Sequence, residues 1–244
     1  MGYVWGKLKA LWIVLWWAIA SIAFFAPITL AGIFSRSGNL AFKLCQAWVW
    51  WGKTVAGVRI ETRGTENFEA GRKYVIISNH QSLYDIPALM LGLGVQFRWV
   101  IKKSFVYVPL FGWALYFARH VFIDRGNPKK SIRSMHESAK RLPPGVSVTV
   151  FAEGTRSDDG VVREFKAGGF LMALRAGLPI VPVTVNGSWR VLPDKRSMAF
   201  HPGPIQVIVG EPIETAEYSR KDLGALIERT RDAVLANLDP DYPG

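Results

Sequence analysis

Along most of the chain, short apolar runs alternate with longer stretches in which apolar residues recur every three or four positions. The runs are rich in Val and Ile, as buried strands are, and the longer stretches have the period of amphipathic helices. Strands are predicted at 74–78, 97–101, 120–123, 146–151, 180–185 and 205–209, and helices at 82–93, 109–119, 128–142, 166–176 and 220–238. Because strands and helices alternate, the predicted fold class is α/β, with a mostly parallel (mixed) sheet covered by helices.

The N-terminal part has a different pattern, because no charged residue occurs from Leu11 to Phe34. A spanning helix needs about 20 apolar residues, so this segment is long enough to cross a membrane. Pro27 lies inside it, and a second apolar stretch, Leu40 to Trp51, follows a polar turn. The two stretches therefore also fit a helical hairpin that enters one leaflet and returns. A third interpretation is a cleaved signal peptide, since Ala18-Ile19-Ala20 resembles a cleavage site, although apolar residues continue beyond it.

The second stretch favours the hairpin because it contains three tryptophans, Trp48, Trp50 and Trp51. A lone spanning helix would leave them without apolar surroundings, whereas a helical pair embedded in one leaflet buries both stretches. The predicted organisation is a membrane-anchoring segment at 1–51, a connection at 52–73 and an α/β domain at 74–244.

Basic residues outnumber acidic residues by 30 to 19, which gives the chain a net charge of +11. They occur in pairs along the chain, among them Lys102-Lys103 and Lys129-Lys130, a distribution that suits an anionic leaflet and an anionic ligand. Nucleic acid is the rival partner, but the sequence has no zinc finger, RNP-like motif or basic zipper, so we expect no nucleic-acid partner. The single cysteine excludes an intrachain disulfide, and the scattered histidines form no metal-binding pattern.

The candidate catalytic residues are His80 and Asp85, which lie directly after the first predicted strand. A neutral imidazole can take a proton from a hydroxyl, and a carboxylate on its other ring nitrogen fixes the tautomer. The chain has no GxSxG motif and its cysteine, Cys45, lies far away in an apolar stretch, so the activated hydroxyl can belong to the substrate itself. The structural alternative is a helix capping box formed by Ser82 and Asp85.

A candidate anion site follows the run at 146–151 and consists of Glu153, Gly154, Thr155 and Arg156. The glycine lets the backbone approach an anion, the threonine can donate one hydrogen bond, and the arginine offers two parallel donors that suit phosphate. An ordinary polar turn is the alternative. Arg125 follows another predicted strand, and strand ends are where α/β sheets bind ligands.

Taken in order, these segments resemble the lysophospholipid acyltransferase family, most closely its bacterial 1-acyl-glycerol-3-phosphate acyltransferases. The resemblance covers most of residues 74 to 212. Its blocks are NHxxxxD at Asn79 to Asp85, a phenylalanine-to-arginine block at Phe122 to Arg125, EGTR at Glu153 to Arg156, and Val-Pro-Val at 181 to 183. A lysine-containing segment, Lys102-Lys103-Ser104-Phe105 through Pro109 and Gly112, also matches, although many relatives have an acid in place of Ser104.

The resemblance implies acyl transfer from acyl-CoA or acyl carrier protein to the 2-hydroxyl of 1-acyl-glycerol-3-phosphate (lysophosphatidate), giving phosphatidate. His80 would act as the general base and Asp85 would hold its ring. Arg125 and the EGTR segment, Glu153, Gly154, Thr155 and Arg156, would form the phosphate site, with the glutamate positioning an arginine or the glycerol. Lys102 and Lys103 are possible further substrate contacts. No cofactor beyond the acyl thioester co-substrate is implied, and no metal.

The expected partners are the lipid bilayer, lysophosphatidate, and acyl-CoA or acyl carrier protein. Since such donors are cytosolic, the expected location is the cytoplasmic face of the cell inner membrane. An acyltransferase of the same family with another lysolipid acceptor is an alternative. A basic membrane-associated binding protein without catalysis is a more distant one, but it would have no chemical need for the His80, Asp85, Glu153 and Arg156 set.

Overall fold

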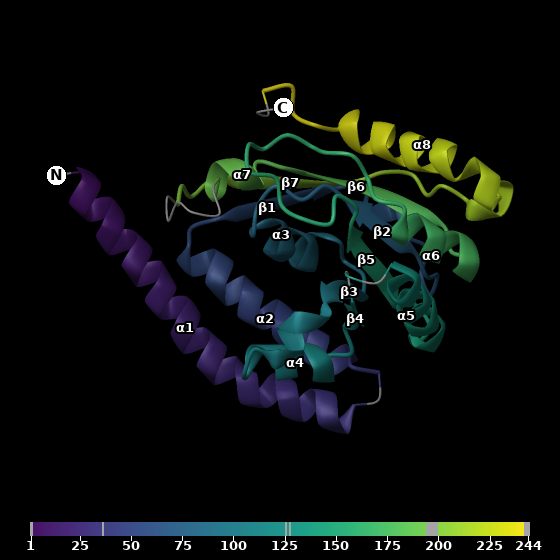
Figure 1. Ribbon diagram of the computed structural model, residues 1–244. Coiled ribbons are helices and arrows are strands. Elements are labelled where there is room, and N and C mark those ends of the chain that lie inside the picture. Colours follow the sequence, from purple (N-terminus) through teal and green to yellow (C-terminus); the bar gives the residue numbers. More distant parts are fainter. Residues whose placement is uncertain (1, 36, 125, 127, 194–199, 242–244) are drawn as a thin grey trace.

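The computed structural model describes all residues except 1, 36, 125, 127, 194–199 and 242–244. In this part of the chain a seven-stranded sheet has the order β1-β7-β6-β2-β5-β3-β4 (Figure 1). The strands are β1 (Arg59–Arg63), β2 (Val75–Ser78), β3 (Phe97–Lys102), β4 (Val121–Ile123), β5 (Ser147–Phe151), β6 (Ile180–Asn186) and β7 (Pro204–Val209). The pair β6–β7 is antiparallel and the other pairs are parallel. The predicted α/β class with a mostly parallel, mixed sheet is therefore confirmed.

Helices cover both faces of the sheet. They are α1 (Gly2–Phe34), α2 (Asn39–Val55), α3 (Asp85–Gly92), α4 (Phe111–Phe117), α5 (Pro128–Arg141), α6 (Gly168–Ala176), α7 (Ser188–Val191) and α8 (Leu223–Leu235). Short 3-10 turns are η1 (Thr65–Asn67), η2 (Lys103–Tyr107), η3 (Thr215–Glu217) and η4 (Arg220–Asp222). Buried residues of α2 and α3 form one core cluster, and those of α5, α6 and α8 form a second. Ile76 belongs to the first and Ile77 to the second, as the alternation of side chains along a strand requires.

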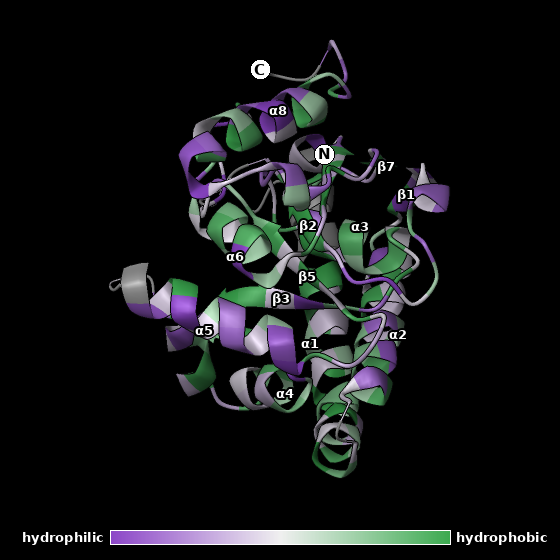
Figure 2. Cartoon of the chain, turned by 90° about the vertical axis from the view of Figure 1, so that its right-hand side faces the viewer, coloured by the Kyte–Doolittle hydropathy of each residue, from purple (hydrophilic) through white to green (hydrophobic). Residues whose placement is uncertain are grey.

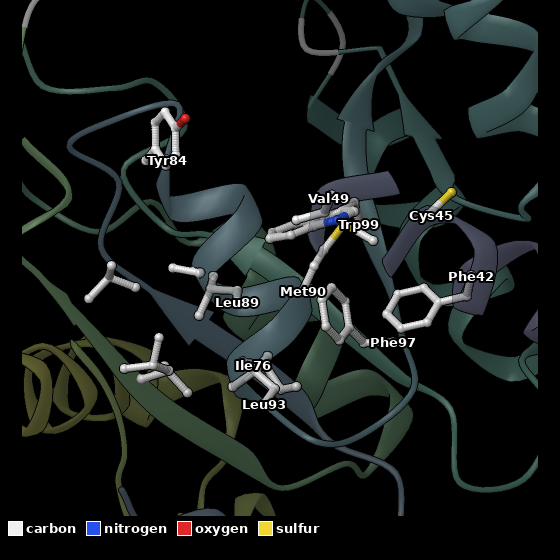
Figure 3. Packing of buried hydrophobic residues seen from close by; sticks show 14 of the residues in the cluster. Phe42, Cys45, Val49, Ile76, Tyr84, Leu89, Met90, Leu93, Phe97 and Trp99 are labelled. Carbon is white, nitrogen blue, oxygen red and sulfur yellow. The ribbon is translucent and has the colours of Figure 1, made fainter. Parts of the chain in front are cut away.

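The first core cluster joins the N-terminal helices to the sheet (Figure 3). Phe42 of α2 packs edge-on against Phe97 of β3, with ring centroids 5.0 Å apart. The guanidinium of Arg98, which is fully buried, lies over the Phe42 ring and donates to Ser37 O and to Asn39 Oδ1, both at 2.8 Å. These contacts attach the turn between α1 and α2 to the sheet.

The helices α1 and α2 pack against each other and are joined by a short turn, as a helical hairpin requires (Figure 1). That this hairpin enters one leaflet stays a prediction. Trp17 meets Trp48 with ring centroids 5.0 Å apart. A Cβ atom at Gly52 would lie 2.2 Å from the Trp17 ring, so the close approach of the helices requires glycine there. Within α1, Leu11–Phe34 is long and apolar enough to cross a membrane, and most of its side chains are exposed.

Residues 52–73, predicted as a connection, also contribute the edge strand β1. Its register with β7 runs from Arg59↔Pro204 to Arg63↔Ile208. The sequence pattern did not predict this strand because its side chains alternate only between exposed and half-buried. The helix predicted from residue 82 begins at Asp85, since the preceding residues form the loop that holds the candidate dyad.

Candidate active site

His80, in the loop after β2, and Asp85, the first residue of α3, form a hydrogen-bonded pair. His80 Nδ1 lies 2.8 Å from Asp85 Oδ2, and the same oxygen accepts from the backbone N–H groups of Gln81 at 2.8 Å and Ser82 at 2.9 Å. An ionised carboxylate only accepts, so Nδ1 carries the proton and Nε2 remains as the basic nitrogen of the ring. The arrangement is that of a general base and its orienting acid.

The environment of Asp85 directs its charge toward the imidazole. Its side chain is fully buried, and its second oxygen, Oδ1, is also buried and accepts no hydrogen bond from the described residues. The oxygen that contacts Nδ1 is thus placed to hold the proton on that ring nitrogen. The predicted capping box is not formed, because α3 begins at Asp85 with Tyr84 as its N-cap and has no side-chain cap hydrogen bond, although Asp85 accepts from Ser82 N in the preceding loop.

Asn79 fixes the start of this loop to the neighbouring strand β6. Its side chain donates to Val185 O at 2.9 Å and accepts from Val185 N at 2.8 Å, as another strand residue would. The Nδ2 group also lies 2.5 Å from Gln81 Oε1. Because Asn79 is fully buried, these bonds replace lost hydration and hold His80 at the carboxyl end of β2.

Phe151, the last residue of β5, lies flat against the His80 ring. The ring centroids are 3.7 Å apart and the planes differ by 6°. Phe151 is itself stacked on Trp99 of β3 at 5.0 Å. This aromatic column limits rotation of the imidazole and keeps Nε2 aimed in one direction. The motif spacing did not reveal it, because it depends on β2, β5 and β3 being neighbours in the sheet.

Glu153, predicted as part of the phosphate site, binds the catalytic loop in this structure. Its buried carboxylate accepts from His80 N at 2.6 Å, from Gln81 Nε2 at 3.1 Å and from Arg163 N at 2.9 Å. Burial raises the pKa of Glu153, and these hydrogen bonds oppose the shift. Since donors of the protein occupy both oxygens, Glu153 joins the His80 loop to the EGTR turn and acts as a positioning residue.

Lys166, which was not among the predicted site residues, lies beside the EGTR turn. Gly154 has a positive φ of 75°, and a Cβ atom there would lie 3.1 Å from Lys166 Nζ. Thr155 is exposed and Arg156 is half-buried. The turn thus gathers two cationic side chains near a glycine backbone, a combination that suits phosphate oxygens. Arg125 lies outside the described residues, and its role stays a prediction.

Lys102 and Lys103 lie at the carboxyl end of β3, next to the end of β5. Both are exposed, and they line a hollow of about 230 Å³ with Ser104, Tyr107, Ile123 and Asp124. Because β2, β5, β3 and β4 are parallel neighbours, the dyad, the EGTR turn and these lysines all follow carboxyl strand ends at one edge of the sheet.

The family model for acyltransferases matches residues 59–186, which is more than half of the chain and includes all the site residues described above. The chain belongs to the acyltransferase family. This confirms the resemblance inferred from the sequence blocks.

Two relatives of this acyltransferase show how far the similarity extends. The 1-acyl-sn-glycerol-3-phosphate acyltransferase of Pseudomonas aeruginosa is 34% identical over 202 residues, covering 80% of this chain and 76% of the relative. The human 1-acyl-sn-glycerol-3-phosphate acyltransferase alpha is 35% identical over 184 residues, covering 75% of this chain and 65% of the human protein. The similarity therefore spans most of the α/β domain in bacterial and animal acyltransferases.

A crystal structure of a 1-acyl-sn-glycerophosphate acyltransferase from Thermotoga maritima has the same fold as this acyltransferase. The TM-score is 0.77 at 24% sequence identity, and the alignment covers 98% of this chain and 100% of the other. The coverage includes the N-terminal helices as well as the sheet.

Among the described residues, no group of three or more His, Cys, Asp and Glu side chains could hold a metal ion. Two other histidines contact residues outside the dyad, His120 at Trp99 N and His136 at Arg175 O. His120 is buried and its Nδ1 lies 3.1 Å from Trp99 N, from which it accepts, and burial lowers the pKa of His120 to about 3. It is therefore a neutral, structural residue of the acyltransferase, as predicted for the histidines without an acidic partner.

Proposed function

We propose that this acyltransferase transfers an acyl group from acyl-CoA or acyl carrier protein to the 2-hydroxyl of 1-acyl-glycerol-3-phosphate, giving phosphatidate. The observation that carries the proposal is the His80–Asp85 pair, with Nδ1 bonded to the carboxylate and Nε2 left as a base at the ligand-binding edge of the sheet. The names of the relatives support lysophosphatidate as the acceptor.

In the proposed reaction, His80 Nε2 takes the proton of the acceptor's 2-hydroxyl as the hydroxyl oxygen attacks the thioester carbonyl. The new ester bond forms when the tetrahedral intermediate collapses and the carbon–sulfur bond breaks. The proton on Nε2 then passes to the departing thiolate, which restores the neutral imidazole and releases the free thiol. Asp85 stabilises the imidazolium during this cycle. Because the acceptor's hydroxyl attacks the thioester directly, no covalent acyl-enzyme is needed.

The acceptor's phosphate is proposed to bind at the EGTR turn. Arg156 and Lys166 supply positive charge and Thr155 supplies a hydroxyl, while the positive φ of Gly154 shapes the turn around the anion. Arg125 is retained as a fourth contact from its sequence position. Charge on the phosphate fixes one end of the acceptor, which brings its hydroxyl into attack geometry at His80. Lys102 and Lys103 are proposed to contact the anionic donor.

The helices α1 and α2 are proposed to hold the protein on the cytoplasmic face of the inner membrane. The apolar exposed side chains of α1 support membrane association, and both acyl donors are cytosolic molecules. A hairpin in one leaflet leaves the dyad beside the lipid and within reach of the soluble donor.

The direct test is release of free thiol from an acyl thioester by the purified full chain in lipid vesicles. Lysophosphatidate, lysophosphatidylcholine and lysophosphatidylglycerol are compared as acceptors, with acyl-CoA and acyl carrier protein as separate donors. We expect acceptor-dependent release that is fastest with lysophosphatidate. Release that proceeds equally without acceptor would exclude acyl transfer, and a faster rate with another lysolipid would reassign the acceptor.

A further inference from the structure

The segment from Lys103 to Phe117, which comprises η2, a turn and α4, exposes many large apolar side chains. They are Phe105, Tyr107, Val108, Leu110, Phe111, Trp113 and Tyr116, with Tyr107 exposed to 73%. The segment contains no acidic residue, and Lys102 and Arg119 flank it. A water-facing surface helix normally alternates such residues with charges, so this composition requires an apolar environment. We call residues 103–117 the α4 lip.

The α4 lip packs against α1, so its apolar surface is continuous with that of the anchoring helix. Trp113 and Phe25 have ring centroids 6.5 Å apart. A Cβ atom at Gly32 would lie 2.5 Å from Phe117 O, so glycine alone permits this close approach of the two backbones. Figure 2 shows α4 beside the lower part of α1, where both are coloured mainly green to white.

Leu110, in the turn before α4, has a backbone conformation that leucine seldom adopts. Its φ is 63° and its ψ is −64°, and Phe111 N donates to Pro109 O across it at 2.7 Å, which makes a strained γ-turn. Glycine or asparagine would adopt a positive φ at lower cost, yet the leucine side chain is half exposed and adds little to the core. A strained leucine that faces outward indicates a role outside the folded domain.

We propose that the α4 lip is a second membrane-contacting surface, which inserts into the same leaflet as the α1–α2 hairpin. The proposal rests on the membrane association in the proposed function and extends it to the catalytic domain. A lipid leaflet fits this surface better than a protein partner, because Tyr107, Trp113 and Tyr116 are residues of membrane interfaces and the flanking charges are all basic.

The position of the α4 lip connects the leaflet to the dyad. The lip begins where β3 ends, and Trp99 of β3 supports Phe151, on which His80 is stacked. An acceptor lipid that leaves the leaflet beside the lip therefore arrives at the carboxyl edge of the sheet, where Nε2 of His80 lies. Insertion of the lip thus places the reacting hydroxyl near the membrane surface.

Depth of insertion can be measured with an environment-sensitive fluorophore on single cysteines in a Cys45→Ala background. The probe sites are Tyr107→Cys in the lip, Ile22→Cys on the exposed side of α1 and Glu228→Cys on α8, at the opposite end of the molecule (Figure 1). The full chain is bound to vesicles of phosphatidylethanolamine and phosphatidylglycerol that contain a lipid-borne quencher. We expect a blue shift and quenching at Tyr107 and Ile22, and neither at Glu228.

The outcomes separate this proposal from the anchor. If the Tyr107 label stays as exposed to water as the Glu228 label while the Ile22 label is quenched, the anchor holds and the lip proposal is wrong. If the Ile22 label is also exposed to water, the membrane association itself is wrong and the lip proposal falls with it.

Substitution of Leu110 gives a second test of the proposal, which needs no fluorescent label. Leu110→Asn suits the positive φ but removes the apolar side chain, and Leu110→Met is the matched control that keeps it. With acceptor in vesicles, we expect the Asn variant to lose about tenfold in rate, the size expected when one leucine no longer enters lipid. With a short-chain acceptor dissolved in water, both variants should match the wild type. An equal loss on both acceptors, or no loss on vesicles, overturns the proposal.

Discussion

The ring of Phe151 lies parallel to the imidazole of His80, with centroids 3.7 Å apart and planes within 6°. The contact joins the last residue of β5 to the loop after β2 and holds the general base from one side, while Asp85 holds it from the edge. The strand β5 and the start of the helix α3 therefore together set the direction of Nε2.

Replacing Phe151 tests this support. Phe151→Leu keeps an apolar side chain but removes the flat surface, so we expect kcat to fall about ten- to a hundredfold through misdirection of the base. The KM for the acyl donor should change little. Phe151→Tyr keeps the ring and should retain most of the activity in steady-state assays. Equal activity of the leucine and tyrosine variants would show that stacking has no part in the reaction.

Substitutions in the dyad itself should lower kcat further than those at Phe151. His80→Ala should lower kcat by about two to four orders of magnitude, because general-base catalysis contributes that much. Asp85→Asn should also cost heavily, since an amide cannot hold the same tautomer. His136→Ala is the matched control, because His136 lies on α5 and its Nε2 contacts Arg175 O rather than a residue of the dyad. Near-normal turnover of the His80→Ala protein, with its circular dichroism spectrum preserved, would disprove the mechanism.

The raised pKa of Glu153 predicts that the free energy of unfolding depends on pH. Because burial raises its pKa, the folded protein retains this proton to a higher pH than the unfolded chain does. The stabilisation of the folded state by protonated Glu153 is fully present below the usual glutamate pKa of about 4.3. It is lost as pH rises through the raised pKa of the folded state. Denaturant unfolding of the wild type and Glu153→Gln across this window should show the loss in the wild type alone. The same slope in both proteins would assign the pH dependence to other groups.

Glu153→Gln should also weaken the loop. An amide nitrogen would face one of the N–H donors that the carboxylate now accepts, so we expect a loss of about 1–3 kcal/mol in the free energy of unfolding. Activity should fall mainly in kcat, since the residue positions His80 rather than a substrate. A change confined to the KM for lysophosphatidate would indicate that Glu153 belongs to the phosphate site, as the sequence predicted.

Arg156 tests the phosphate site. Arg156→Ala should raise the KM for lysophosphatidate about ten- to a hundredfold, because a charge-assisted hydrogen bond contributes about 1.5–3 kcal/mol. The KM for the acyl donor should change far less. Arg220→Ala, at an exposed site in η4, controls for the loss of one positive charge. Parallel increases in both KM values would indicate that Arg156 binds the acyl donor or supports the fold.

The anchor geometry predicts where the N-terminus lies. In a leaflet-embedded hairpin the N-terminus stays on the cytoplasmic side. A cysteine at Gly2 in a Cys45→Ala background should therefore react with a membrane-impermeant reagent in inside-out vesicles and not in intact spheroplasts. Labelling from outside spheroplasts would instead show that α1 spans the bilayer.

The sequence predicted the features that depend on local order. Strand positions followed from apolar runs, and the dyad followed from a spacing that lies within one loop. The partners of Phe151 and Arg98 could not be predicted in this way, because each joins segments that only the sheet order brings together. Arg98 lies within β3 and bonds to Asn39 at the start of α2, a contact between residues 59 positions apart. The hydrogen bonds of Glu153 could not be predicted for the same reason, since two of its donors, His80 N and Gln81 Nε2, lie in the loop after β2.

The pairing of β1 with β7 has a consequence for biosynthesis. Arg59 pairs with Pro204, so a nascent chain presents β1 long before its partner has been translated. By then α1 and α2 have been made and can already have reached the membrane. A copy that stops before Pro204 would retain the helical pair and the dyad residues, yet leave β1 and one side of β6 with unpaired backbone groups. Such strand edges recruit other chains, so truncated products should aggregate.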